Sequence, residues 1–183
     1  IRHTATVSLG GRNVTNDIAI GLRTSVEQAE SIKIASGAAV ASAVSADEMI
    51  TVSTPGARED REISRHVLAS IIEPRMEEIF SLTLREMKRS GIGDTPTGGI
   101  VLCGGGSALP GSVDLAEQIF DMPVRAGELS GFDHTPDELA TPAYATAHGL
   151  AAYGFRHEPM RGHRRSSVRN VLKKMENWIS NKF

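Results

Sequence analysis

The sequence predicts an α/β fold with an inserted subdomain and a separate amphipathic helix at the C-terminal end. Three observations support this fold class. Short apolar runs alternate with segments of helical periodicity, as in folds that cover a sheet with helices. The longest helical pattern interrupts this alternation, which indicates an insertion. At the end of the chain, a polar stretch precedes a short segment in which basic and apolar residues alternate with helical spacing.

The composition is typical of a globular protein. A chain of 183 residues, 40% of them hydrophobic, can form one sizeable domain or two small ones that share a sheet. No apolar run reaches about 18 residues and no signal peptide is visible, so we expect no membrane-spanning segment. The single cysteine, Cys103, excludes an internal disulfide and suits a reducing compartment. The chain begins with Ile1 rather than Met, and we interpret it as a piece of a longer protein.

The N-terminal segment is predicted to form one strand and two helices. Residues 2–11 alternate polar and apolar side chains and end in two glycines, which predicts a strand. Asn13 or Thr15 can cap a first helix with one apolar face. Thr24 or Ser25 can open a second helix, which continues to a glycine that can cap its end.

The predicted insertion combines a short strand, a turn and a long helix. Residues 49–53 are apolar and β-branched enough for a strand, and residues 54–60 read as a turn. From residue 64 to residue 87, apolar side chains recur at i, i+3 and i+4, which is the strongest helical signal in this part of the chain. Pro74 lies inside the pattern, and we expect a kink or a break near it.

The segment after the insertion returns to the α/β alternation. Residues 99–103 form a continuous apolar run, which predicts a strand buried on both faces. A helix is predicted over residues 107–120 and a short strand over residues 122–127. Residues 140–155 are rich in alanine and glycine and predict a closely packed helix.

A triple glycine joins the apolar run to the helix that follows it. Gly104, Gly105 and Gly106 let the backbone turn sharply and approach a flat or bulky group, because no Cβ atoms intervene. Free N–H groups at the start of the next helix can face a phosphate or a ribose. Taken alone, the motif fits a ligand site and a tight turn without a ligand equally well.

Few other residues suggest a catalytic, ligand-binding or metal-binding role. Glu30 and Lys33 lie on one face of their predicted helix, but such a pair is more often a solvated ion pair than part of a site. The six histidines lack the spacing of metal ligands, and Cys103 is interpreted as a buried small residue. No nucleophile and base are paired in the sequence, so we predict no catalytic residues and no metal site.

Three motifs in this order resemble the FtsA family of bacterial actin-like cell-division proteins. They are "LGG…NVTNDIAIGLRTSVEQAESIKI", "IIEPRMEEIF" and "GGIVLCGGGSALPGSVDLAEQIFDMPVRAG". The resemblance covers residues 1–154 and extends to the tail. It implies an actin-like ATPase fold, related to ribonuclease H, of which this chain is the second half. The implied parts are subdomain 2A (1–37 and 98–155), the inserted subdomain 2B (38–97), a flexible linker (156–167) and a membrane-targeting helix (168–183).

The resemblance also implies an ATP site, with Mg²⁺ in the full-length protein. Gly104, Gly105 and Gly106 would line its adenosine side, and Glu30 and Lys33 occupy positions that contact the adenosine in actin-like proteins. The phosphate loop that precedes this segment in the family, and the whole first half, are not in the chain. We therefore expect weak or no ATP binding by this chain alone, no hydrolysis, and at most a weak ATPase in the full-length protein.

The inserted subdomain carries several arginines among acidic residues, which alone would be an ordinary solvated helix end. In the FtsA family this subdomain receives the acidic C-terminal peptide of FtsZ, the tubulin-like division protein. Arg61 and Arg75 match family arginines tied to that contact. A basic helix edge suits a peptide that offers a carboxylate and apolar anchors.

Residues 161–183 differ in charge from the rest of the chain. They include seven basic residues and one acidic residue, a net charge of +6, and because the whole chain carries −2, residues 1–160 carry −8. A basic tail on an acidic body indicates an anionic partner, either lipid headgroups, nucleic acid or an acidic protein.

The tail also predicts a basic amphipathic helix over residues 168–183. Its apolar side chains fall within an arc of roughly 140° on a helical wheel. Such helices lie in the membrane interface, where the only tryptophan suits the boundary between water and lipid. Packing on a partner protein or on the body of the chain is the alternative, but the resemblance implies membrane targeting. The predicted membrane contacts are Val168, Val171, Leu172, Lys173, Lys174, Met175, Trp178, Ile179 and Phe183.

We therefore expect an ATP-binding, actin-like adaptor that polymerises and tethers FtsZ filaments, the Z ring, to the cytoplasmic face of the inner membrane at the bacterial division septum. Expected partners are the FtsZ C-terminal peptide, further copies of the protein, anionic lipids and other division proteins, but no nucleic acid. The alternative is another actin-fold assembly ATPase, MreB-like or PilM-like, which the motif "TNDIAIGLRT" and the C-terminal helix disfavour. A sugar kinase would need a sugar cleft and a catalytic aspartate.

Overall fold

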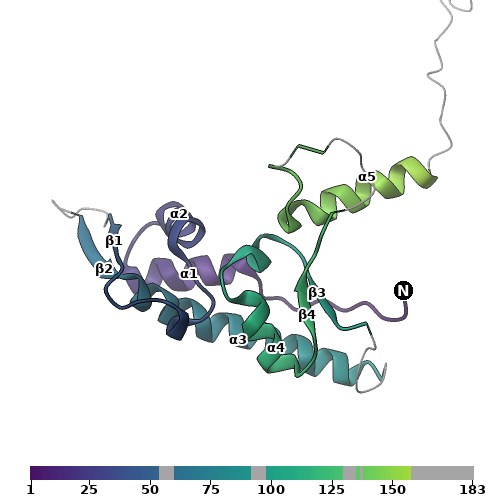
Figure 1. Cartoon of the computed structure of the whole chain (residues 1–183), viewed down its shortest axis with the longest axis horizontal. Helices are drawn as coiled ribbons and strands as arrows, with labels where there is room; N and C mark the ends of the chain where they lie inside the picture. Colours follow the sequence, from purple (N-terminus) through teal and green to yellow (C-terminus); the bar gives the residue numbers. More distant parts are fainter. Residues whose placement is uncertain (54–59, 92–97, 130–134, 137, 158–183) are drawn as a thin grey trace, which may run out of the picture. The chain divides into compact units, whose positions relative to one another are not determined.

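The structure is a computed structural model, and Figure 1 shows its elements in chain order. The predicted membrane helix, the linker from residue 158 onward and most of the predicted turn at 54–60 lie outside the described residues. The chain forms two units, and each is described by itself: residues 1–146, and a second unit that begins at Ala147. The described residues are 1–53, 60–91, 98–129, 135–136 and 138–157.

The first helix, α1 (Gly11–Leu22), begins before the predicted caps. The Gly10 N–H donates to Asn13 Oδ1 at 3.0 Å, so Asn13 stabilises the helix start from inside the first turn. The strand predicted for residues 2–11 is wrong. Its backbone groups need a partner strand, and no strand of the described chain pairs with this segment, whose residues 2–6 are exposed.

The second helix, α2 (Val26–Ser36), confirms Ser25 as its cap. The Gln28 N–H donates to Ser25 Oγ at 3.2 Å. The helix ends at Gly37 as predicted, although with an extended backbone rather than a left-handed one. Glycine is required there for space, because a Cβ atom would come within 2.4 Å of the Lys33 carbonyl oxygen and 2.8 Å of Leu109.

The insertion begins with the short 3-10 helix η1 (Ala41–Ala43) and continues with an antiparallel pair of strands, β1 (Met49–Val52) and β2 (Arg61–Ser64). Met49 pairs with Ser64 and Val52 with Arg61. The predicted strand at 49–53 is thereby confirmed, while the second strand, β2, carried no recognisable pattern of its own.

The long helix α3 (Arg65–Arg89) runs through Pro74 without interruption, so a break at the proline is excluded. The Ser64 hydroxyl caps it by accepting the His66 N–H at 3.2 Å. Proline removes one backbone hydrogen bond, but buried apolar residues on both sides of it anchor the helix in the core. These residues are Leu68, Ile72, Met76 and Phe80.

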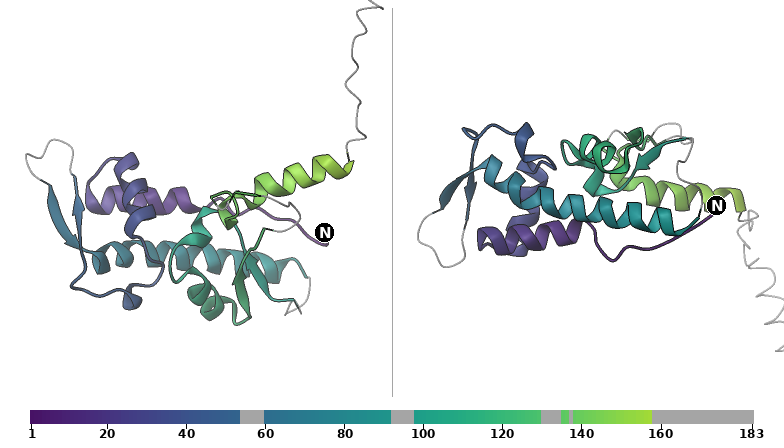
Figure 2. Two further views of the ribbon diagram at one scale, coloured as in Figure 1. Left: turned by 45° about the horizontal axis from the view of Figure 1, so that its top comes forward. Right: turned by 90° about the horizontal axis from the view of Figure 1, so that it is seen from below.

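The helices α1 and α3 run side by side in both views of Figure 2 and in Figure 1. The apolar face of α1 is buried between α2 and α3, with Val14 and Ile18 both fully covered. At Gly21 the two long helices approach so closely that a Cβ atom would come within 2.9 Å of Ile71 Cδ1. One continuous core therefore joins the first two helices to the insertion.

Two parallel strands follow, β3 (Ile100–Leu102) and β4 (Val124–Ala126), with Ile100 opposite Val124. The prediction of burial on both faces is wrong for β3, because Val101 is 45% exposed. Ile100 and Leu102 pack against the core on one face of this two-stranded sheet, while Val101 points to the other face. Cys103, predicted to be buried, is exposed because it follows the end of the strand.

The helix predicted over residues 107–120 is divided into a 3-10 helix, η2 (Gly105–Ala108), and α4 (Ser112–Phe120). Gly111 separates them with a left-handed backbone, φ 80°, that favours glycine. The 3-10 helix η3 (Pro142–Tyr144) then leads to the last described helix.

That last helix, α5 (Ala145–His157), continues two residues into the predicted linker. The Tyr153 and His157 rings stack with centroids 4.0 Å apart at its end. None of its residues is buried within the unit to which it belongs, and the close packing of this helix stays a prediction. Of the helices that the structure describes, none combines the length and the apolar character needed to cross a bilayer.

Candidate functional site

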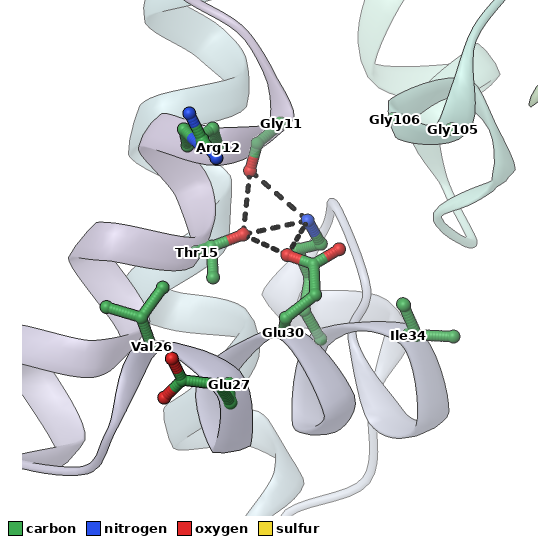
Figure 3. A pocket seen from close by; sticks show the side chains of 10 residues that line it. Gly11, Arg12, Thr15, Val26, Glu27, Glu30, Ile34, Gly105 and Gly106 are labelled. Carbon is green, nitrogen blue, oxygen red and sulfur yellow. Dashed lines mark hydrogen bonds and ion pairs between the residues drawn. The ribbon is translucent and has the colours of Figure 1, made fainter.

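A cavity of about 650 Å³ lies between the first turns of α1, the exposed face of α2 and the glycine turn at the start of η2 (Figure 3). Three segments that are far apart in the sequence form its wall. The structure brings Glu30 and Lys33, predicted from one motif, to the same cavity as Gly105 and Gly106, predicted from another. The lining residues are Gly11, Arg12, Thr15, Val26, Glu27, Glu30, Lys33, Ile34, Gly105 and Gly106.

Gly104 lies beside this cavity and lines a second one of about 290 Å³. The second cavity shares Gly11, Gly105 and Gly106 with the first, and its floor is formed by apolar side chains of α3, including Phe80. All three glycines of the motif therefore border open space at the end of β3.

The Lys33 side chain is the centre of a hydrogen-bond network. The residue is only 9% exposed, and its Nζ donates to Glu30 Oε2 at 2.7 Å, to Thr15 Oγ1 at 2.9 Å and to the Gly11 carbonyl oxygen at 3.2 Å. A buried ammonium group needs such partners, because transfer out of water without them is costly. The simple solvated ion pair is therefore the wrong interpretation of Glu30 and Lys33.

Glu30 is the member of this network whose charged group is exposed to the cavity. Its side chain is 45% exposed, and Figure 3 shows one carboxylate oxygen pointing away from Thr15, while the other takes part in the network. Burial raises the pKa of Glu30, but the hydrogen bonds from Lys33 and Thr15 and the charges of Lys33 and Arg12 outweigh it, so that the pKa is lowered. The carboxylate is therefore ionised at neutral pH and can accept hydrogen bonds from a ligand.

The glycine turn leaves space rather than filling it. Gly104 has φ 96°, which favours glycine, and its N–H donates to the Pro142 carbonyl oxygen at 2.8 Å. At Gly105 and Gly106 a Cβ atom would meet no described atom within 4 Å. Internal packing therefore does not require glycine at these two positions, and the space that they leave open belongs to the cavity.

Sequence reasoning missed the contribution of α1 to this site. Gly11, Arg12 and Thr15 line the cavity, but residues 2–11 were predicted as a strand and Thr15 as a cap. One signal was present: Thr15 lies next to Val14 on the buried face of the helix, and a polar residue on such a face needs a partner.

Arg75 lies away from this cavity and is already paired. Its Nε and Nη2 atoms donate to the two carboxylate oxygens of Asp17 at 2.5 and 3.1 Å, and Nη1 donates to Glu78. The hydrogen bond to Asp17 is the main reason why the pKa of Arg75 is raised. Arg61 also contacts α1, since its guanidinium group donates to the Leu22 carbonyl oxygen. Both predicted peptide-binding arginines thus connect the insertion to α1.

In the part of the chain that the structure describes, no cluster of three or more histidine, cysteine, aspartate or glutamate side chains is arranged to hold a metal ion. The predicted membrane contacts at 168–183 lie outside the described residues. The chemistry of the described site is therefore that of a cavity lined by the carboxylates of Glu27 and Glu30, the Arg12 side chain, the nearly buried Lys33 ammonium group and an open glycine turn.

Comparison of the chain with known proteins identifies its family. The family model described as "Cell division protein FtsA" matches residues 1–149. The chain is 41% identical over 192 aligned positions to the cell division protein FtsA of Pseudomonas aeruginosa, covering 100% of this chain and 46% of that protein. FtsA of Escherichia coli K12 is 32% identical, with the same coverage, and FtsA of Bacillus subtilis is 37% identical over 87% of this chain and 35% of that protein.

Solved structures support the fold. MreB5 of Spiroplasma citri bound to ADP has a TM-score of 0.61 at 16% identity and covers 82% of this chain and 45% of that chain. The same protein bound to AMPPNP has a TM-score of 0.57 at 15% identity and covers 93% and 47%. These likenesses show the actin-like fold alone. The family match and the FtsA relatives decide for FtsA over an MreB-like or PilM-like ATPase or a sugar kinase. The chain, which spans less than half the length of these relatives, belongs to the FtsA family of cell division proteins.

Proposed function

We propose that this chain is the nucleotide-binding half of an actin-like division adaptor. The full-length protein would bind ATP with Mg²⁺, polymerise, and tether FtsZ filaments to the cytoplasmic face of the inner membrane at the septum. The observation that carries the proposal is the cavity in which Glu30 and Lys33 meet the glycine turn. Subdomain 2A would comprise residues 1–37 and 98–155, and subdomain 2B residues 38–97.

The cavity suits a nucleotide in size and in chemistry. Its volume of about 650 Å³ lies within the usual range for small-molecule sites. The ionised Glu30 can accept hydrogen bonds from sugar hydroxyl groups, and the exposed Ile34, 74% accessible, offers an apolar surface to a flat base. That the similar MreB5 structures hold ADP and AMPPNP supports the assignment.

A titration with a fluorescent ATP analogue and Mg²⁺ tests this assignment. We expect saturable binding by the full-length protein, displaced by excess ADP, and binding about tenfold or more weaker by this chain alone, which spans less than half the length of its FtsA relatives. Phosphate release should be slow or absent. A full-length protein that does not bind the analogue would contradict the proposed function.

The proposed peptide contact at Arg75 is consistent with its remaining donors. A guanidinium group has five N–H donors, and three of them are used by Asp17 and Glu78. The other two can meet a carboxylate of the FtsZ peptide, while the two bonds to Asp17 hold the group in one orientation. Arg61 would have a smaller, supporting role at the same edge.

The substitution Arg75→Glu is expected to weaken binding of an FtsZ C-terminal peptide by about tenfold or more, because it places a like charge beside the peptide carboxylate. Arg75→Lys should have an intermediate effect, since lysine keeps the charge but loses the planar fork. Fluorescence anisotropy measures the affinity, and Arg85→Glu, an exposed position on the same helix, is the matched control. Unchanged affinity in Arg75→Glu would remove Arg75 from the peptide site.

The proposed membrane contact is tested by co-sedimentation of the full-length protein with anionic liposomes. We expect intact protein to pellet, and Trp178→Glu and a version ending at Glu158 to stay in solution. Added salt should weaken the binding, because each basic residue near the surface contributes about 1 kcal/mol that is screened. Equal behaviour of all three proteins would contradict a membrane role for the tail.

A further inference from the structure

Lys33 has no donor left for a ligand. An ammonium group carries three N–H bonds, and the structure provides three acceptors, on Glu30, Thr15 and the Gly11 carbonyl group. Donation to a nucleotide would require one of these bonds to break inside a nearly buried environment, where a lost partner is costly. The polar group that the network presents to the cavity is therefore the Glu30 carboxylate, which is far more exposed than Lys33.

Thr15 holds this arrangement together from the other helix. It is 2% exposed, and its hydroxyl oxygen accepts from Lys33 at 2.9 Å. The same hydroxyl lies within hydrogen-bond distance of Glu30 Oε2 and of the Gly11 carbonyl oxygen, and its single proton goes to one of them at a time. This one side chain thus contacts both charged members of the pair and connects α1 to α2 (Figure 3).

We infer that Thr15 is a positioning residue of the nucleotide site, which fixes the Glu30 carboxylate for the ligand both directly and through Lys33, and that Lys33 acts by the same route rather than by touching the nucleotide. The inference rests on the proposed function. It assigns to the buried threonine hydroxyl a role in affinity, and it separates Glu30, which meets the ligand, from Lys33 and Thr15, which orient Glu30.

Loss of the hydroxyl group should lower nucleotide affinity and also cost some stability, because a nearly buried Lys33 N–H is left without its acceptor. In Thr15→Val the side chain keeps its shape, but one Lys33 N–H loses its acceptor and Glu30 loses a neighbour that restrains it. We expect affinity for a fluorescent ATP analogue to fall by about 10- to 100-fold in the full-length protein, because Glu30 is no longer preorganised for the ligand. Thr15→Ser retains the hydroxyl and should bind within about threefold of the unaltered protein.

A matched control exists on α3. Thr83 also donates its hydroxyl to the carbonyl oxygen four residues earlier, that of Ile79, but it does not line the cavity. Thr83→Val removes the same kind of local hydrogen bond and should leave nucleotide affinity unchanged. Thermal unfolding of each variant without nucleotide reports whether the fold is retained.

A double-mutant cycle tests the role assigned to Lys33. If Thr15 and Lys33 act together on Glu30, the double substitution Thr15→Val with Lys33→Met should weaken binding no more than the stronger single substitution. If Lys33 contacts the nucleotide independently, the two losses will multiply, and that result would overturn the inference.

The remaining outcomes separate the inference from the proposed function. Failure of the unaltered full-length protein to bind the analogue removes the proposed function and the inference with it. Binding by the unaltered protein that Thr15→Val leaves intact overturns the inference alone. A serine variant as weak as the valine variant also overturns it, because the threonine methyl group rather than its hydroxyl would then be responsible.

Discussion

Replacing Gly106 by valine is expected to weaken nucleotide binding by about 100-fold or more, because a clash with the ligand excludes it from the site. Gly106 lines the cavity, and a Cβ atom at this position would meet no described atom within 4 Å. Its φ angle does not lie in the left-handed region that favours glycine. A Cβ atom at this position strains no described neighbour, and we expect the branched side chain to occupy space at the cavity wall with little change in the thermal unfolding midpoint.

The control for this substitution is Gly98→Val. A Cβ atom at Gly98 also meets nothing within 4 Å, and Gly98 does not line either cavity. Gly104 is unsuitable as a control, since its φ of 96° makes any side chain there strained. Titration with the fluorescent ATP analogue compares the variants. Equal affinity of Gly106→Val and the unaltered protein would mean that the nucleotide does not approach the glycine turn.

Replacing Ile72 by alanine is expected to lower the free energy of unfolding by about 2–5 kcal/mol. Ile72 is fully buried in the core, and its Cδ1 atom lies beside Gly37 at the end of α2. The substitution removes buried apolar area and leaves a cavity where α3 meets α2, so the effect combines both costs. Urea denaturation measures the change in the full-length protein.

Val67 offers a matched control for the core substitution. It lies on the same helix but is 47% exposed, and Val67→Ala should cost no more than about 1 kcal/mol. If Ile72→Ala and Val67→Ala destabilise the protein equally, the core does not extend through α3 as described. Because the same core supports α2, partial loss of nucleotide affinity in Ile72→Ala would be a secondary effect of the weakened fold.

The sequence revealed the residues of the candidate site but not the contacts that Lys33 makes there. Glu30 and Lys33 share a face because they lie one turn apart, and the glycine motif is visible as a run of letters. What the sequence could not show is the meeting of Lys33 with Thr15 and Gly11, which lie 18 and 22 residues away. That meeting depends on how α1 crosses α2, and it turns an ordinary ion pair into a buried network.

Arg75 is a second case in which the sequence reveals the position of a residue but not its contacts. The sequence predicts that Arg75 lies on a long helix and carries charge toward a partner. The structure pairs it with Asp17, 58 residues earlier, so its orientation depends on the packing of α1 against α3. No local pattern encodes such a pair, because both residues look like ordinary exposed charges when each helix is considered alone.

The sequence by itself determined the long helix α3, the cap of α2 at Ser25, the strands β3 and β4 and the glycine turn, because these depend on side chains within a few positions of one another. It also determined the family, through three motifs spread along the chain. Only the tertiary structure decided that residues 2–10 form no strand and that β3 is buried on one face. It also decided that Lys33 is nearly buried with all three N–H donors in hydrogen bonds, and that α1 completes the cavity wall. Burial and pairing are properties of neighbours that are distant along the chain. They arise when packing removes water from a group and brings its partners to it.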